Sequence, residues 1–245
     1  MSNRKVLAIL SGGLDSSTML WKLQQDGYEV MATISFNYGQ RHSKELQGIP
    51  ALLDAFTEQF GKRPESMIVD ISVLRELAAS GAVMGDEELP KKAYDVETQK
   101  VTIVPNRNAI FISLAAARAV AMGYQYVAYA AHSNDHSVYP DCRPEFVEAM
   151  DRTLELANAW TPVNLLAPFV RSSKADIVKI GSETGTPFEL TWSCYEGGDR
   201  PCLECGTCLE RTSSFKEAGF PDPALTTDEW SQALKNLNSG NIMGN

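Results

Sequence analysis

Two groups of residues in this sequence have the types and spacing that binding chemistry requires. The first is the stretch LSGGLDSST, residues 10–18, in which an apolar run leads into two glycines, an acid and three hydroxyl side chains. The second is four cysteines in the pattern C-x7-C-x2-C-x2-C, at Cys194, Cys202, Cys205 and Cys208. The first pattern is typical of phosphate binding, and the second is typical of metal binding.

The glycine-rich stretch lies between a predicted buried strand at Lys5–Leu10 and a predicted helix at Asp15–Asp26. The N-terminus of a helix offers unpaired N–H groups and a partial positive charge, which attract anions. Gly12 and Gly13 let the backbone approach a phosphate, and Asp15 has the side chain that holds Mg²⁺ against phosphate oxygens. A tight turn with a Ser or Asp cap is the structural alternative, but S-G-G-x-D-S directly after a strand favours phosphate binding.

The four clustered cysteines have the ligand type and spacing of a tetrahedral zinc site. Gly, Pro and charged residues lie between them, which argues against a set of small packed side chains. An iron–sulfur cluster is the other option, since it also uses four thiolates. Four thiolates leave zinc no open position, so the site is predicted to be structural. The odd total of five cysteines suits a metal site in a reducing compartment better than a disulfide framework.

Apolar runs alternate with amphipathic stretches along the chain, which predicts an α/β fold with a parallel sheet and helices on both faces. Residues 1–190 are expected to form the nucleotide-binding domain, and residues 191–245 a zinc-binding region with C-terminal helices, in one compact unit. Ser80–Thr102 has no clear period and is predicted to be a long surface excursion. The predicted strands are Lys5–Leu10, Val30–Phe36, Ser66–Asp70, Tyr126–Ala131 and Asn164–Pro168, and the predicted helices are Asp15–Asp26, Ser43–Phe60, Val73–Ala79, Asn108–Met122, Arg143–Ala159, Ser173–Thr184, Leu209–Ala218 and Thr227–Leu237.

The composition of the 245 residues is that of an ordinary globular protein, with 44% hydrophobic and 22% charged residues. The net charge of −9 argues against nucleic acid as the main partner, because proteins that grip phosphate backbones usually present a basic face. No segment approaches the roughly 20 apolar residues of a membrane span, and the apolar run at Val6–Leu10 is too short for a secretory signal. We therefore expect a cytoplasmic protein with no membrane and no direct nucleic-acid partner.

The stretch SGGLDSST after the first strand resembles the PP-loop of the ATP pyrophosphatases. The resemblance implies that ATP is split between its α and β phosphates and that the AMP activates a carbonyl or carboxylate oxygen. The hydroxyl groups of Ser11, Ser16 and Ser17 are predicted to donate hydrogen bonds to phosphate. The predicted nucleotide-binding residues are Leu10, Ser11, Gly12, Gly13, Leu14, Asp15, Ser16, Ser17, Thr18 and Arg107.

Five further stretches narrow the resemblance to one family. These stretches are FNYGQRH (36–42), VPNRN (104–108), YPDCRPEF (139–146), SKADIV (173–178) and the spaced cysteines. With the PP-loop they resemble the 7-cyano-7-deazaguanine synthases of the queuosine pathway, from about Lys5 to Phe220. The resemblance implies a Rossmann-like fold of the adenine nucleotide alpha hydrolase type, ATP, Mg²⁺, one structural zinc per chain and a homodimer. It also implies an ATP-dependent carbon–nitrogen ligase. In such an enzyme 7-carboxy-7-deazaguanine and ammonia give the nitrile through adenylated acid and amide intermediates, with AMP and pyrophosphate as the favoured products.

Positions that match the family pattern supply the remaining candidates. Arg41 follows the second strand and Lys174 opens a helix, and both are predicted to be catalytic together with Asp15, although each alone is an ordinary surface charge. For Asp141, a turn with Pro140 that caps the next helix is a compatible structural role. The predicted substrate-binding residues are His42, Asp135, His136, Tyr139, Asp141 and Arg143.

One segment departs from the family pattern D-F/Y-S-G-Y-P. It has His136 in place of the aromatic residue and Val138 in place of the glycine. A related enzyme that stops at the 7-amido product is therefore the first alternative. A PP-loop tRNA-modifying enzyme such as a thiolase is the second, and the acidic net charge counts against it. A zinc-ribbon binding module with a degenerate nucleotide fold is the third, and the intact S-G-G-x-D-S counts against it.

Overall fold

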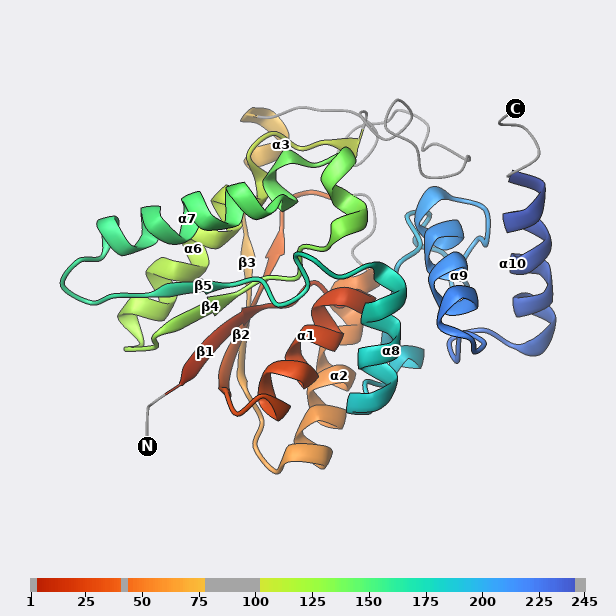
Figure 1. Cartoon of the computed structure of the whole chain (residues 1–245), viewed down its shortest axis with the longest axis horizontal. Helices are drawn as coiled ribbons and strands as arrows, with labels where there is room; N and C mark the ends of the chain where they lie inside the picture. The colour runs from red at the N-terminus through yellow and green to blue at the C-terminus, as the bar shows by residue number, and fades with distance from the viewer. Residues whose placement is uncertain (1–3, 41–43, 78–101, 241–245) are drawn as a thin grey trace.

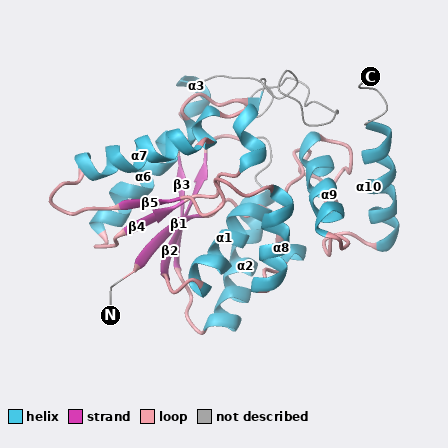
Figure 2. Ribbon diagram, viewed as in Figure 1, coloured by secondary structure: helices cyan, strands magenta, loops and turns pink. Residues whose placement is uncertain are grey.

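The computed structural model describes residues 4–40, 44–77 and 102–240. Its five strands form one parallel sheet in the order β3-β2-β1-β4-β5, which confirms the predicted α/β fold (Figures 1 and 2). The direction of strand order reverses at β1, so β1 and β4 form the switch point of the sheet. The strands are β1 (Lys5–Ile9), β2 (Glu29–Asn37), β3 (Glu65–Asp70), β4 (Tyr126–Ala128) and β5 (Asn164–Leu166).

Helices cover both faces of the sheet (Figure 1). One face carries α6 (Arg107–Ala121) and α7 (Pro144–Ala157), and the other carries α1 (Leu14–Gln25), α2 (Lys44–Phe60) and α8 (Lys174–Thr184). The short helix α3 (Leu74–Leu77) follows β3, while α9 (Gly206–Ala218) packs on α8 and α10 (Thr227–Gly240) packs on α9. The layers therefore place β1 and its following turn at the centre of the molecule.

The burial of β1 explains the continuous apolar run from which this strand was predicted. Leu7 packs into the core under α6 and α7, whereas Val6 and Ala8 pack into the core under α1 and α8. All three side chains are fully buried. A central parallel strand is covered on both faces, so it carries a continuous apolar run instead of an alternating one.

The cysteine region is fixed to the same core through α9. The ring of Phe215 is fully buried and contacts the ring of Phe188 edge to face, with ring centres 5.2 Å apart. Arg211 forms a buried ion pair with Asp222 and donates to the carbonyl oxygen of Phe188 at 3.0 Å. Together with the packing of α9 on α8, these contacts join the end of the cysteine region to the rest of the fold.

Several predicted boundaries shift in the structure. β4 ends at Ala128 and not at Ala131, because the chain leaves the sheet there to line a cavity. α9 begins at Gly206 and not at Leu209. The helix predicted at Ser173–Thr184 is confirmed as α8, and Ser173 is its N-cap, with a reciprocal pair of hydrogen bonds to Asp176.

Some predictions fall outside the described ranges. These include the helix start at Ser43 and nearly all of the excursion at Ser80–Thr102. Within the ranges that are described, none of the helices combines the length and the apolar character that crossing a membrane would take.

Candidate active site

A cavity of about 270 Å³ opens at the carboxyl edge of the sheet, over the switch point between β1 and β4. This is the place where open α/β sheets bind ligands. Its wall holds two groups of side chains that we name by their chemistry. The charged cluster consists of Asp15, His132, Asp135, Lys174 and Glu210, and the aromatic cluster consists of Phe36, Tyr38, Glu45, Arg107, Phe111, Tyr139 and Tyr195.

The glycine-rich turn joins β1 to α1 at the floor of the cavity. Gly12 has a φ of +88°, and a Cβ at this position would lie 2.1 Å from the main-chain carbonyl oxygen of Glu45 in α2, so only glycine fits. The Ser11 N–H donates to the Ser16 hydroxyl at 3.1 Å, and the two hydroxyl oxygens lie 2.9 Å apart. These bonds shape a turn in which the N-terminus of α1 and the side chain of Asp15 face the cavity.

The charged cluster is a chain of alternating charges. Asp15 Oδ2 lies 3.4 Å from the Lys174 ammonium and 3.7 Å from His132 Nε2. At the two ends of the chain, Lys174 contacts Glu210 Oε2 at 2.6 Å and His132 Nε2 contacts Asp135 Oδ2 at 3.4 Å. Each buried charge therefore lies next to a charge of opposite sign. Such pairing offsets the cost of removing the charges from water.

The pKa values of the cluster follow from these contacts. Burial favours the neutral form of Asp15, but the charges of Lys174 and His132 outweigh it and hold the pKa of Asp15 well below its usual range. Burial acts to lower the pKa of His132, yet the charges of Asp135 and Asp15 raise it to about 9. Burial also opposes the charged form of Lys174, but the carboxylates of Asp15 and Glu210 raise the pKa of Lys174. At neutral pH, Asp15 is an anion and its two partners are cations.

Two carboxylate oxygens of the charged cluster lack a hydrogen-bond partner in the described part of the chain. They are Asp15 Oδ1 and Glu210 Oε1, and both are buried. A buried carboxylate oxygen without a donor is costly. Mg²⁺ prefers one or two carboxylate oxygens together with phosphate oxygens. Asp15 therefore fits a divalent cation that also contacts a bound phosphate.

The aromatic cluster surrounds Arg107 at the start of α6. The Arg107 guanidinium carbon lies 5.8 Å from the centre of the Tyr38 ring. Burial acts against its charge, but the neighbouring Tyr38 and Tyr139 and nearby acidic groups raise the pKa of Arg107. Phe36 and Phe111 stack with their ring centres 4.3 Å apart. Rings and a guanidinium in this arrangement offer flat surfaces to a planar ligand.

Ten of the predicted site residues line the cavity, namely Leu10, Ser11, Gly13, Leu14, Asp15, Ser16, Arg107, Asp135, Tyr139 and Lys174. Arg41 and His42 lie outside the described residues. Ser17 is fully buried within α1, and the Thr18 hydroxyl donates to the Leu14 carbonyl oxygen at 2.9 Å. The predicted residues that do not belong to the cavity wall are Gly12, Ser17, Thr18, His136, Asp141 and Arg143.

The segment after β4 shows what the last three of these residues do in the fold. The Asp141 carboxylate accepts the Asn108 N–H at 3.1 Å, so it caps the first turn of α6 and not that of the helix that follows it. Arg143 Nε donates to the carbonyl oxygen of His136 at 2.7 Å. These residues hold the wall in place, behind Tyr139 and Asp135.

Glu45, His132 and Glu210 belong to the cavity although they were not among the predicted site residues. The two glutamates look like ordinary acids of exposed helix faces in the sequence, and only the folded chain brings them to the cavity. For His132 a signal exists. It lies just beyond β4, and the carboxyl ends of β4 and β1 must be neighbours in a sheet of this order.

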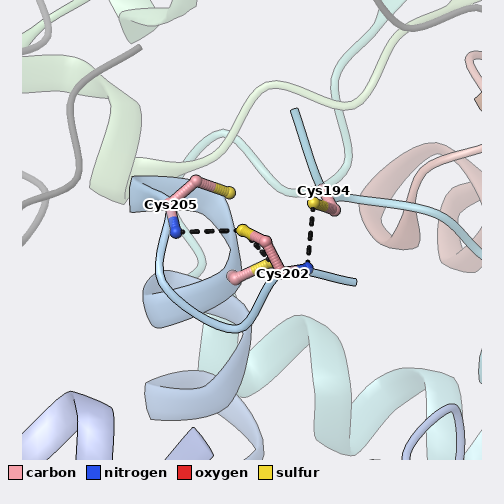
Figure 3. A group of neighbouring side chains, drawn as sticks. Cys194, Cys202 and Cys205 are labelled. Carbon is pink, nitrogen blue, oxygen red and sulfur yellow. Dashed lines mark hydrogen bonds between the residues drawn. The ribbon is translucent and has the colours of Figure 1, made fainter. Parts of the chain in front are cut away.

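The four cysteines form a compact cluster, as predicted, and Figure 3 labels three of them, Cys194, Cys202 and Cys205. Their sulfur atoms all lie within 4.8 Å of one another, and those of Cys202 and Cys208 are 3.9 Å apart. The N–H groups of Cys202 and Cys205 donate to the sulfurs of Cys194 and Cys202, each at 3.3 Å. Among the described residues, this is the only such set of three or more side chains close enough to share a metal ion.

The cysteine cluster touches the glycine-rich turn through Trp192. The Trp192 N–H donates to the carbonyl oxygen of Gly12 at 3.1 Å, and its indole N–H donates to the carbonyl oxygen of Cys194 at 2.8 Å. The Lys44 ammonium lies 4.2 Å from the centre of the same indole ring. One wall of the cavity is therefore built on the cysteine cluster.

Comparison with known proteins decides the family. The sequence pattern of the family described as "Queuosine biosynthesis protein QueC" matches residues 5–219. The chain belongs to the QueC family. This QueC-family chain is 53% identical over 231 residues to the 7-cyano-7-deazaguanine synthase of Archaeoglobus fulgidus, covering 94% of each chain. It is 40% identical over 238 residues to that of Brucella anthropi, covering 96% of this chain and 100% of the relative.

One solved structure that matches is more distant from this QueC-family chain. The U34-tRNA thiolase NcsA from Methanococcus maripaludis matches with a TM-score of 0.44 and 16% identity, covering 99% of this chain and 73% of that one. The family assignment thus stands on the sequence relatives.

Proposed function

We propose that this protein converts 7-carboxy-7-deazaguanine, ammonia and ATP to 7-cyano-7-deazaguanine. The observation that carries the proposal is one cavity that holds both a charged cluster at a helix N-terminus and an aromatic cluster, in a member of the QueC family. The first suits a triphosphate and the second suits a planar heterocycle. The names of the relatives support the product.

The charged cluster suits the cleavage of ATP between its α and β phosphates. The N–H groups at the start of α1 and the ammonium of Lys174 face the same space as Asp15. Charge that develops on a leaving pyrophosphate would meet donors that are already fixed in place, which is the largest single source of catalysis in such reactions. Mg²⁺ held by Asp15 Oδ1 would neutralise part of the same charge.

The proposed sequence uses one site twice. A carboxylate oxygen of the substrate attacks the α phosphorus of ATP, pyrophosphate leaves, and an acyl adenylate forms. Ammonia then attacks the carbonyl carbon, and AMP and a proton leave to give the amide. The amide oxygen attacks a second ATP in the same way. Loss of AMP and a proton from this adenylate leaves the nitrile, so both substrate oxygens end in AMP.

The remaining predicted residues are assigned by their place in the cavity. We assign Lys174 to the phosphates together with Asp15, and Tyr139 and Asp135 to the wall around the substrate. Arg107 was predicted to bind the nucleotide, and its place among the aromatic rings also suits contact with the organic substrate. His132 stays protonated at neutral pH, so we assign it a charge-balancing role and not that of a base.

We also propose that the cysteine cluster holds zinc and that its role is structural. Zinc–sulfur bonds of about 2.3 Å in a tetrahedron place the sulfurs about 3.8 Å apart, close to the 3.9 Å between Cys202 and Cys208. A four-iron cube spreads its thiolates over different iron atoms and so requires wider spacing. Metal analysis of the purified protein by mass spectrometry is expected to give one zinc per chain, and iron in its place would refute the assignment.

The product assay tests the proposed function. Purified protein is incubated with ATP, Mg²⁺, ammonium and 7-carboxy-7-deazaguanine, and the products are identified by mass spectrometry. We expect the nitrile, AMP and pyrophosphate, with the amide as a transient. Amide that accumulates with no nitrile at long times would support the enzyme that stops at the amide. A homodimer and a cytoplasmic location stay predictions, and light scattering of the purified protein measures the first.

A further inference from the structure

Glu45 differs from the other acids of the cavity. Asp15, Asp135 and Glu210 each contact a cation of the charged cluster. Glu45 comes from the first turn of α2 and belongs to the aromatic cluster, where Arg107 is its charged neighbour. An acid among aromatic rings contributes nothing to phosphate binding, because it repels anions. Its presence in the wall therefore calls for a ligand that an acid attracts.

The position of Glu45 is fixed by the turn that binds phosphate. Its carbonyl oxygen packs so closely on Gly12 that no side chain fits between them. The first turn of α2 therefore lies directly against the glycine-rich turn, which places Glu45 at the cavity wall. Burial raises the pKa of Glu45 to about 8, and the opposing effects of Arg107 and of a hydrogen bond from Gln40 do not cancel that rise. Burying an acid has a cost in free energy. An acid that the fold nevertheless holds at a cavity wall is therefore a candidate for ligand binding.

A carboxylate is complementary to one edge of a guanine-type ring. That edge presents two parallel N–H groups, one from the ring nitrogen and one from the 2-amino group, and a carboxylate accepts both. The corresponding edge of adenine pairs a donor with an acceptor and lacks this match. The aromatic cluster supplies flat surfaces on which either ring can stack, so the acid is the element that discriminates between them.

We propose that Glu45 is the specificity-determining residue that binds the guanine-type N–H edge of the organic substrate. The inference rests on the proposed function and adds a recognition role to the same cavity. It assigns the aromatic cluster to the deazaguanine ring, and Asp15 and Lys174 of the charged cluster to the phosphates of ATP. Glu45 does not touch the reacting atoms, so its removal should change the binding of the substrate ring and leave the affinity for ATP intact.

The test is calorimetric titration of the full-length protein with 7-carboxy-7-deazaguanine, and separately with ATP. Glu45→Gln keeps the size of the side chain but can accept only one of the two N–H groups. At a pH of about 8.5, where the Glu45 carboxyl is mostly ionised, we expect the dissociation constant for 7-carboxy-7-deazaguanine to rise roughly 10- to 100-fold, the range that loss of a charged hydrogen bond produces. Glu58→Gln, on the exposed face of the same helix, is the matched control and should change nothing. Thermal melting verifies that both variants fold.

A substrate analogue without the 2-amino group gives a second readout that a merely structural residue would not move. Wild-type protein should bind the analogue more weakly than 7-carboxy-7-deazaguanine, whereas Glu45→Gln should discriminate little between the two. Equal discrimination by both proteins would overturn the inference, and so would a variant that loses affinity for ATP and not for the base. If wild-type protein binds no 7-carboxy-7-deazaguanine at all, the proposed function fails together with the inference.

Discussion

The charged cluster and the aromatic cluster line the same cavity but hold their charges in different ways. In the first, Lys174 lies between the carboxylates of Asp15 and Glu210, at 3.4 and 2.6 Å. In the second, Arg107 lies over the ring of Tyr38 among several other aromatic side chains. When one member of a short ion pair is removed, its partner is left as a buried charge without a counter-charge, so the whole pair is lost. When one ring of the aromatic cluster is changed, the other rings keep their contacts. The two clusters should therefore respond differently to single changes.

The largest effect is expected from Asp15→Asn. The change keeps the shape of the side chain but removes the anion that Lys174 and His132 contact and the oxygen that would hold Mg²⁺. We expect kcat/KM for pyrophosphate release to fall by about 10³ or more, the scale of losing one preorganised electrostatic group. Asp26→Asn, at the exposed end of the same helix, is the control. Activity within tenfold of wild type would show that the charged cluster is not the phosphate site.

The pH dependence of substrate binding is expected to be the next largest effect. Because the pKa of Glu45 is raised to about 8, the group is mostly protonated below that pH and accepts N–H groups only as it ionises. Affinity for 7-carboxy-7-deazaguanine should therefore rise roughly tenfold per unit between about pH 6 and about pH 7.5 and level off above about 8. Among the described residues, the groups around Glu45 are Arg107, Gln40 and Tyr38, and none of these titrates in this window. A similar slope in Glu45→Gln would assign the dependence to another group.

Metal removal should affect both stability and the glycine-rich turn. Structural zinc contributes its binding energy to folding, so chelation or Cys205→Ser should lower the melting temperature by about 10 °C. Because Trp192 links the cysteine cluster to the carbonyl oxygen of Gly12, the affinity for ATP should also weaken, by roughly tenfold. The difference in fluorescence between wild type and Trp192→Phe follows both events, and Trp160→Phe, at a fully exposed tryptophan, is the control. Metal-free protein with unchanged ATP affinity would separate the cysteine cluster from the turn.

The smallest effect is expected from Tyr139→Phe in the aromatic cluster. The ring stays in the wall, and only the hydroxyl group 2.6 Å from the Thr102 hydroxyl is lost. We expect a rise in KM for 7-carboxy-7-deazaguanine of about fivefold or less and an unchanged kcat. Tyr124→Phe, a buried tyrosine outside the cavity, is the control. A loss as large as that for Asp15→Asn would show that the two clusters do not differ as proposed.

The fold could be predicted from the sequence because the patterns that indicate it involve residues close together in the chain. The apolar run of β1, the glycine-rich turn and the cap at Ser173 each depend on residues within a few positions of one another. The cysteine cluster was accessible for the same reason, since three of its ligands fall within seven residues. Local patterns of this kind were enough to predict the turn between β1 and α1 and the compact cluster of four cysteines.

Other contacts in and around the cavity could not be predicted in the same way. Glu45 belongs to a helix whose sequence period gives no reason to single it out, and it reaches the cavity only because Gly12 allows α2 to pack on the turn. Glu210 likewise becomes a partner of Lys174 only when α9 packs on α8. The Asp141 carboxylate accepts an N–H of α6, a residue 33 positions earlier in the chain. Long-range packing decides all three, and no local pattern encodes it.

The central claim is that one cavity adenylates the substrate carboxylate and then the amide. The most direct measurement starts from 7-carboxy-7-deazaguanine with both carboxylate oxygens replaced by oxygen-18, and weighs the AMP and the pyrophosphate formed. We predict one heavy oxygen in each of the two AMP molecules, none in pyrophosphate, and an unlabelled nitrile. Heavy oxygen in pyrophosphate or phosphate, or AMP without label, would contradict the account.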